Sequence, residues 1–201
     1  MGLLTASASF ARYTVEGKPP DNFWEFAAER IKSFSFRDID DTVDEYSIGW
    51  VSVQSMFDSE FAYASHAVAD YIVLTMRIDE RKISAAVLNK FARKEEERIK
   101  RERQVPKLSR NHRLEIKEQV RQQLMSRAVP VPAVYDLCWN LADNTLFFFS
   151  NNKKAQAVLE DFFKDSFGMT LVLQVPFLAA GKLVDADAQD ALERLRPAIF
   201  V

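Results

Sequence analysis

The chain of 201 residues contains little cysteine, glycine or proline and no long hydrophobic run. Its single cysteine, Cys138, excludes an internal disulfide framework and fits a reducing cytoplasm. Five glycines and seven prolines exclude collagen-like and low-complexity proteins. The longest apolar runs, such as residues 146–149, are far shorter than the ~20 residues that a transmembrane helix needs. We therefore expect a cytoplasmic protein that has no membrane partner.

Motifs of familiar cofactor and metal sites are missing as well. The sequence has no GxGxxG and no P-loop pattern, and the lone Cys138 cannot form a cysteine zinc site. The two histidines, His66 and His112, are not spaced as a metal pair. We expect no cofactor, no metal and no catalytic residue, so the protein is not expected to be an enzyme.

An acidic cluster keeps one enzymatic alternative open. A metal-dependent nuclease needs two or three carboxylates that converge on Mg²⁺, and this cluster has enough of them. Their spacing matches no metal-binding loop, so an exposed acidic loop is the simpler interpretation. The cluster consists of Asp38, Asp40, Asp41, Asp44 and Glu45.

Strand-like and helical patterns follow one another along the chain. Hydrophobic residues make up 48% of it, with sixteen phenylalanines, which is enough for a sizeable core. The mixture predicts an α+β fold with largely antiparallel sheets, packed helices and a protruding helical hairpin. We expect strands at 7–15, 46–53, 69–79, 133–141, 145–150 and 170–175, a helix after Asp21 as N-cap, and further helices at 84–103, 109–126, 153–167 and 185–194.

Charge divides the chain into a body and a hairpin. Residues 77–127 hold sixteen Lys or Arg and eight Asp or Glu, although the whole chain has a net charge of −2. Pro106 separates the two helices of this segment, so they should pair as an antiparallel hairpin. We expect residues 1–79 and 133–201 to form an α+β body, in which each part carries one helix as a diverged repeat would. Residues 80–132 should form the basic hairpin.

The basic side chains of the hairpin are arranged in rows. In the first helix they lie opposite an apolar stripe, and in the second helix Arg113, Lys117 and Arg121 recur every four residues. Such rows are suited to phosphate backbones, but a solvated helix pair with mixed charges is the alternative interpretation. No aromatic residue lies between Ala92 and Arg127, which favours duplex over single-stranded nucleic acid.

An ordered series of short motifs resembles the recombination-associated protein RdgC family. Gly49-Trp50-Val51 looks like the "GWV" element of that family, and residues 82–130 are similar to its long helical pair. The series continues with Trp139 and the run from Leu146 to Ser150, and the resemblance covers roughly residues 8–178. Within the helical pair the matching elements are Leu108-Ser109-Arg110, Arg113 through Val120, and Leu124 through Pro130, followed by Lys153-Lys154-Ala155.

The resemblance implies a function in DNA recombination. Members of the family are nucleoid-associated, bind double-stranded DNA with little sequence preference, form ring-shaped dimers and restrain RecA-driven recombination. They carry an exonuclease label without an identified catalytic site. Typical members are longer, so the resemblance also implies a short member that lacks the usual C-terminal third, and this bears on ring closure and on DNA affinity.

We therefore expect a nucleoid protein that binds double-stranded DNA as a homodimer and occludes it from a RecA-type recombinase. A metal-dependent exonuclease and a protein-interaction module without DNA affinity are the alternatives. The expected DNA contacts are Lys90, Arg93, Lys94, Lys100, Arg101, Lys107, Arg110, Arg113, Lys117 and Arg121, with Lys153 and Lys154 in support.

Overall fold

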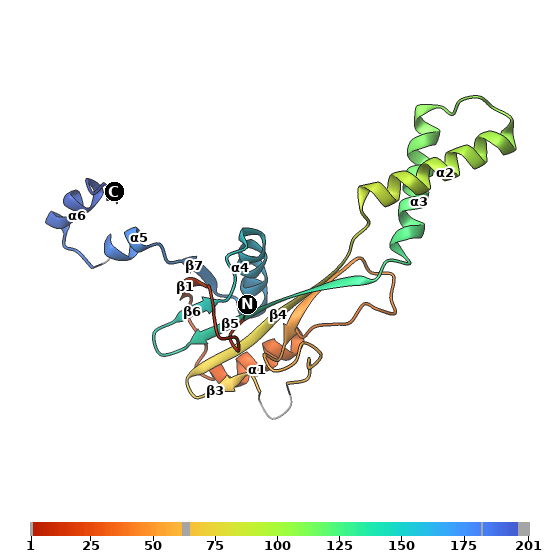
Figure 1. Cartoon of the computed structure of the whole chain (residues 1–201). Coiled ribbons are helices and arrows are strands. Elements are labelled where there is room, and N and C mark those ends of the chain that lie inside the picture. The colour runs from red at the N-terminus through yellow and green to blue at the C-terminus, as the bar shows by residue number, and fades with distance from the viewer. Residues whose placement is uncertain (1, 62–64, 182, 197–201) are drawn as a thin grey trace.

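The computed structural model describes residues 2–61, 65–181 and 183–196 (Figure 1). A central body carries the helical hairpin at one end, and the C-terminal helices extend from the other end. The elements are β1 (Ala11–Glu16), α1 (Phe23–Ser33), β2 (Tyr46–Val51), β3 (Ala67–Val68), β4 (Tyr71–Arg81), α2 (Ala85–Arg103), α3 (Arg110–Met125), β5 (Pro130–Asn140), β6 (Thr145–Phe148), α4 (Lys153–Phe167), β7 (Thr170–Leu173), α5 (Pro176–Gly181) and α6 (Ala186–Glu193).

One antiparallel sheet contains all of these strands, in the order β2-β4-β5-β6-β1-β7, with β3 beside β4. The expected α+β class with antiparallel pairing and a protruding hairpin is confirmed. Strands from the two halves of the body alternate in space, since β4 pairs with β5 and β1 lies between β6 and β7. The two halves therefore share one sheet.

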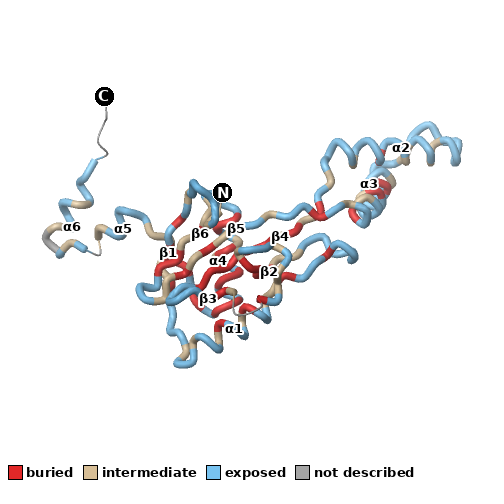
Figure 2. Tube along the Cα trace, turned by 60° about the horizontal axis from the view of Figure 1, so that its bottom comes forward, coloured by how far each residue is buried: buried red, intermediate tan, exposed pale blue. Residues whose placement is uncertain are grey.

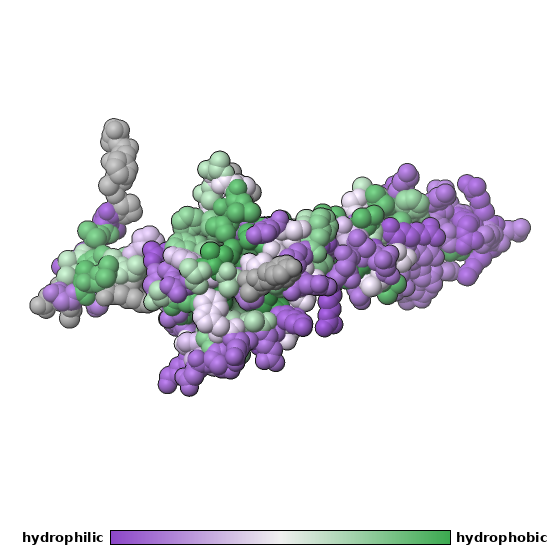
Figure 3. Space-filling view, turned by 90° about the horizontal axis from the view of Figure 1, so that it is seen from below, coloured by the Kyte–Doolittle hydropathy of each residue, from purple (hydrophilic) through white to green (hydrophobic). Residues whose placement is uncertain are grey.

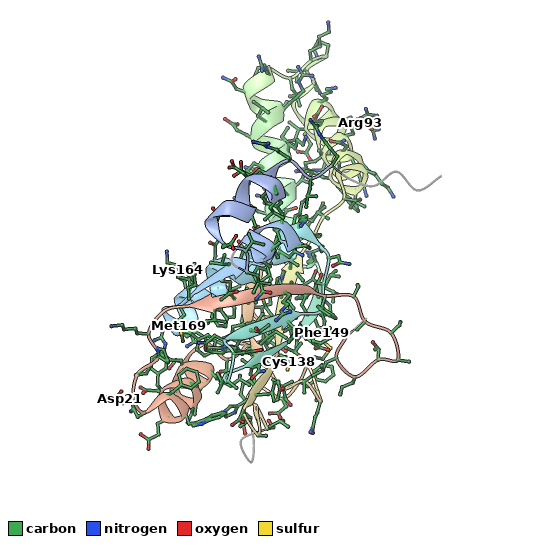
Figure 4. All side chains as sticks on the ribbon, turned by 90° about the vertical axis from the view of Figure 1, so that its left-hand side faces the viewer. Asp21, Arg93, Cys138, Phe149, Lys164 and Met169 are labelled. Atoms are coloured by element: carbon green, nitrogen blue, oxygen red, sulfur yellow. The ribbon has the colours of Figure 1, made fainter. Side chains whose placement is uncertain are left out.

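The hydrophobic core lies between the sheet and the helices α1 and α4, which pack against the same face (Figure 4). Along β4, Ile72, Leu74 and Met76 point into this core at every second position, as a strand with one face against helices requires. Trp50 is fully buried, its ring centroid lies 4.7 Å from that of Phe162, and its indole N–H donates to Ser166 Oγ at 2.9 Å.

Gly49 allows the chain before β2 to come close to the sheet. The Phe36 N–H donates to the Trp50 carbonyl at 3.0 Å, and the Trp50 N–H donates to the Phe34 carbonyl at 2.9 Å. A Cβ atom on Gly49 would lie 2.2 Å from the Phe36 Cα atom, which is too close for any side chain. Glycine at this position is therefore a packing requirement.

The sequence placed several element boundaries wrongly. The N-cap of α1 is Asn22 and not Asp21. β1 begins at Ala11 and not at residue 7, because residues 3–7 form turns and bends, in which the Thr5 hydroxyl donates to the Gly2 carbonyl at 2.7 Å. β5 begins at Pro130, before the expected residue 133, because this part of β5 pairs with β4 and extends beyond the end of β6, where proline interrupts no further pairing.

None of the described helices is long and apolar enough to cross a membrane.

We predict that Gly49→Ala destabilises the fold by about 1–3 kcal/mol, because the new methyl group meets backbone atoms that cannot move aside without shifting a strand. Urea unfolding followed by circular dichroism measures this free energy. Gly181→Ala is the control, since its Cβ would have its nearest neighbour at 3.9 Å, and its stability should remain close to that of the wild type. Equal midpoints for the two variants would contradict the packing role of Gly49.

Candidate nucleic-acid interface

The helical hairpin projects from the body on the paired strands β4 and β5, and hydrophilic side chains cover most of it (Figure 3). Ser84 caps α2 by accepting from the Val87 N–H at 3.3 Å, and Ser109 caps α3 by accepting from the His112 N–H at 3.2 Å. α2 ends at Arg103, and its C-cap Gln104 adopts the left-handed conformation with φ 51°. The caps and the break between the helices thus lie close to the positions expected from the sequence.

The two helices leave a groove on each side of the hairpin. The first, which we call the cationic groove, has a volume of about 460 Å³. It brings Arg93 of α2 together with three basic residues of α3, and Glu96 is the one acidic residue in its lining. Its lining residues are Asn89, Ala92, Arg93, Glu96, Arg110, Arg113, Leu114 and Lys117.

The second groove, which we call the mixed groove, has a volume of about 780 Å³ and combines basic and acidic residues. Arg98 donates to Glu95 and to Glu102 at 2.5 Å each, and its hydrogen bonds lower the pKa of the Glu95 carboxyl. Arg101 lies 4.0 Å from Glu97. The groove contains two of the predicted DNA contacts, Lys94 and Arg101, together with Arg98 and Arg127.

The predicted DNA contacts therefore divide into separate groups. Arg93, Arg110, Arg113 and Lys117 share the cationic groove, whereas Lys94 and Arg101 line the mixed groove. Arg121 is half-buried and forms ion pairs at 3.4 Å with Glu118 and with Glu45 of the acidic loop. The remaining hairpin residues, Lys90, Lys100 and Lys107, lie in neither groove.

Lys153 and Lys154 begin α4 on the body and not on the hairpin. The Lys153 ammonium donates to Gln156 Oε1 at 3.2 Å, and Lys154 is exposed. The structure therefore separates the two lysines from the hairpin residues with which the sequence grouped them.

The position of a basic residue along its helix decides whether the helix dipole stabilises or destabilises its charge. Lys100 and Arg101 lie in the last turn of α2, where cations interact favourably with the helix dipole. The first turns of α3 and α4 hold no acidic residue, although acids would be favourable there. These turns instead begin with Arg110 and with Lys153 and Lys154, whose charges oppose the local dipole. An anion bound at these two helix starts would offset that repulsion.

The stem between the body and the hairpin contains a buried ion pair. Arg77 donates to both carboxylate oxygens of Asp79, at 2.8 and 2.6 Å, and both side chains are almost fully buried. Its guanidinium carbon also lies 4.1 Å from the centroid of the Phe36 ring, which is a cation–π contact. The hydrogen bonds to Asp79 raise the pKa of Arg77.

The candidate catalytic residues are His66, Cys138 and the carboxylates of the acidic loop. Among the described residues, no group of three or more His, Cys, Asp or Glu side chains could hold a metal ion. Burial lowers the pKa of His66 and raises the pKa of the Cys138 thiol, which leaves the histidine neutral and the thiol protonated at pH 7. The carboxylates of the acidic loop are exposed, and only Glu45 among them pairs directly with the hairpin, through Arg121.

Sequence reasoning gave no role to Arg98, Arg127 or Arg81. Arg98 and Arg127 continue the charge pattern of the hairpin and could have been found from it. Arg81 is 5% exposed and binds backbone carbonyls, and no sequence pattern signals such a contact.

We predict that Asp79→Ala destabilises the fold by about 3–5 kcal/mol, because it removes the buried, doubly hydrogen-bonded partner of Arg77 and leaves only the exposed Asp38 carboxylate at 3.9 Å. The free energy of unfolding in urea is the measurement. Glu80→Ala is the control on the same strand, because Glu80 is partly exposed and pairs with the exposed Lys82 at 2.7 Å, a contact that contributes about 0–1 kcal/mol. Losses of similar size in the two variants would show that burial does not govern the Arg77–Asp79 pair.

Comparison with known proteins adds an independent finding. A family model described as "Putative exonuclease, RdgC" matches residues 21–178, from the residue before the N-cap of α1 into α5. No curated protein matches the chain. The matched region includes the whole hairpin and both grooves.

Proposed function

This chain belongs to the RdgC family, and from that premise we propose that it binds double-stranded DNA without sequence preference and occludes it from a RecA-type recombinase. Membership of the family fits a recombination-related role. The proposed role is non-catalytic, and a homodimer with two hairpins on one duplex would obstruct a longer stretch of backbone.

The cationic groove is the observation that carries this proposal. In the described part of the chain, none of its four cations has a carboxylate within the 4.0 Å of an ion pair, so all four are available to external anions. Phosphates need cations at regular spacing and no base-edge geometry, and flexible Lys and Arg side chains on two helices meet that need. The four are Arg93, Arg110, Arg113 and Lys117.

The charge at the helix starts supports the same ligand. Arg110 and Arg113 add to the positive end of the α3 dipole, and Lys153 and Lys154 add to that of α4. Backbone N–H groups at such ends bind phosphate well. Binding through these groups would neutralise phosphates and release counterions, so affinity should fall steeply with salt.

We predict that Arg93→Glu/Arg113→Glu/Lys117→Glu lowers the affinity for duplex DNA on the order of 100-fold at low salt and flattens the salt dependence, because each lost phosphate contact removes about 0.9 from the log–log slope. Fluorescence anisotropy with a labelled, random-sequence duplex at several salt concentrations measures both quantities.

The control is Lys18→Glu/Lys32→Glu/Lys164→Glu, which makes the same change in net charge at exposed positions of the body. Its affinity should fall only slightly, since the positions lie outside both grooves. The proposal fails if both triple variants lose affinity equally, or if the wild type binds the duplex without salt dependence. Recovery of the intact duplex after incubation with Mg²⁺ tests the exonuclease alternative on the same samples.

We predict that Glu95→Gln/Glu102→Gln increases duplex affinity by roughly 3- to 10-fold at low salt. Both carboxylates neutralise Arg98 in the wild type, and their removal leaves its charge uncompensated, which raises the positive potential that attracts the duplex to the hairpin. The same anisotropy assay measures the gain, with Glu25→Gln/Glu29→Gln on the exposed surface of α1 as the charge-matched control. Unchanged affinity in the Glu95/Glu102 variant would mean that the mixed groove faces away from the duplex.

A further inference from the structure

The hairpin is joined to the body by a narrow stem. β4 and β5 pair along their full length, from Tyr71 opposite Asn140 to Arg81 opposite Pro130. β6 supports only residues 137–140 of β5, so the outer part of β5 has no strand on its other side. On the β4 side, β2 flanks the stem from Val51 opposite Thr75 to Tyr46 opposite Glu80. Figure 2 shows that buried residues nevertheless follow β4 to the root of the hairpin. The ladder between β2 and β4 ends at Glu80, so the side chain of the next residue, Arg81, is the first that can link the stem to the hairpin beyond this ladder.

Arg81, the last residue of β4, lies at this root and is 5% exposed. Its guanidinium donates to the carbonyl of Ala128, which lies between α3 and β5. The same group donates to four carbonyls of the loop that precedes β2. These are the carbonyl oxygens of Ile39 at 2.7 Å, Thr42 and Asp44 at 3.0 Å each, and Asp40 at 3.2 Å.

The loop of residues 37–45 thereby connects the body to the hairpin at two points. The Arg81 backbone N–H donates to the Glu45 carbonyl at 2.9 Å, and the Glu45 carboxylate pairs with Arg121 of α3 at 3.4 Å. One contact is buried at the start of the hairpin and the other is exposed farther along α3. The loop therefore links the end of β4 to α3, and Arg81 holds it at the first of these two points.

Only arginine has the donor geometry for this set of contacts. Its planar guanidinium carries five N–H donors in a fixed fork, whereas lysine carries three donors on one atom. The neighbouring Arg77 is also buried, but both of its strongest hydrogen bonds go to Asp79 on the same strand. Arg77 stabilises β4, and Arg81 links β4 to segments on either side of it.

We propose that Arg81 is a positioning residue for duplex binding. It fixes the hairpin relative to the sheet, so that the cationic groove and the lysine pair Lys153–Lys154 can engage the same duplex. This inference rests on the proposed function. Two binding regions held in one geometry act with a high effective concentration, which is lost when the connection between them loosens.

Arg81→Met tests this inference in two independent ways. Fluorescent labels at Lys107→Cys, in the hairpin loop, and Asp143→Cys, in the turn after β5, report the distance between hairpin and body in a Cys138→Ala background. We expect a broader distance distribution in the labelled protein and, in unlabelled Arg81→Met that retains Lys107, a loss of duplex affinity of about tenfold. The slope of affinity against salt should stay unchanged, because no phosphate contact is removed.

Lys82→Met is the matched control. It removes one positive charge from the adjacent position, where the side chain is 66% exposed and pairs only with Glu80 among the described residues. Neither its distance distribution nor its duplex affinity should change appreciably. Arg81→Lys keeps the charge with fewer donors and should give an intermediate broadening. This variant decides the test if Arg81→Met does not fold, as monitored by far-ultraviolet circular dichroism.

Three outcomes would overturn the inference. The first is an unchanged distance distribution in the folded Arg81 variants. The second is a broadened distribution with unchanged duplex affinity. The third is an affinity loss that flattens the salt slope, since Arg81 would then contact phosphate itself. If the wild type does not bind duplex, the proposed function fails with the binding part of the inference, while the distance measurement still decides whether Arg81 fixes the hairpin.

Discussion

The pairing of β4 with β5 is the interaction on which the rest of the structure depends. The pairing runs along the middle of the sheet and continues outward as the stem of the hairpin. Because side chains alternate along a strand, β4 presents two different surfaces. One carries Ile72, Leu74 and Met76 into the core under α1 and α4. The other carries polar residues that are buried as well, and these must find partners.

The partners of those polar residues explain how the loops are arranged. Thr75 donates to Asp136 on β5 at 2.6 Å, and the same carboxylate accepts from the Leu3 N–H at 2.8 Å, which holds the N-terminal segment on the sheet. Farther out, Arg77 binds Asp79 and the Met56 carbonyl, and Arg81 binds the loop before β2. A buried donor without a partner costs about 1–3 kcal/mol, so each residue on this face determines where a neighbouring segment lies.

Local features of the sequence were sufficient to predict the elements but not their partners. The serine caps and the proline break defined the hairpin, and β-branched and large apolar residues defined β4. The choice of Asp21 over Asn22 as N-cap was wrong because neighbouring residues of similar capping propensity cannot be distinguished by type alone.

The candidate site could be predicted as a set of residues but not as a surface. The four-residue spacing in the sequence correctly predicted that Arg113 and Lys117 lie on one side of α3. Whether they share a groove with Arg93 depends on how α2 packs across α3. Likewise, Arg121 belongs to the same sequence row, but its partner Glu45 lies 76 residues earlier in the chain. Contacts of this range are set by the sheet topology, which residue spacing does not encode.

The sequence left two interpretations of the hairpin open, a surface that binds phosphate backbones and a solvated helix pair with mixed charges. Each interpretation applies to a different groove. The mixed groove has the character of a solvated helix pair, because Arg98 is neutralised by Glu95 and Glu102 and the α2 C-terminus is stabilised by its own basic residues. Neither explanation holds for the cationic groove. Its cations have no carboxylate in ion-pair range among the described residues, and those at the start of α3 oppose the helix dipole. Within the described residues, no carboxylate relieves the repulsion among these cations. Such an arrangement is expected where an external anion balances the charge. For this reason the proposed function is assigned to the cationic groove.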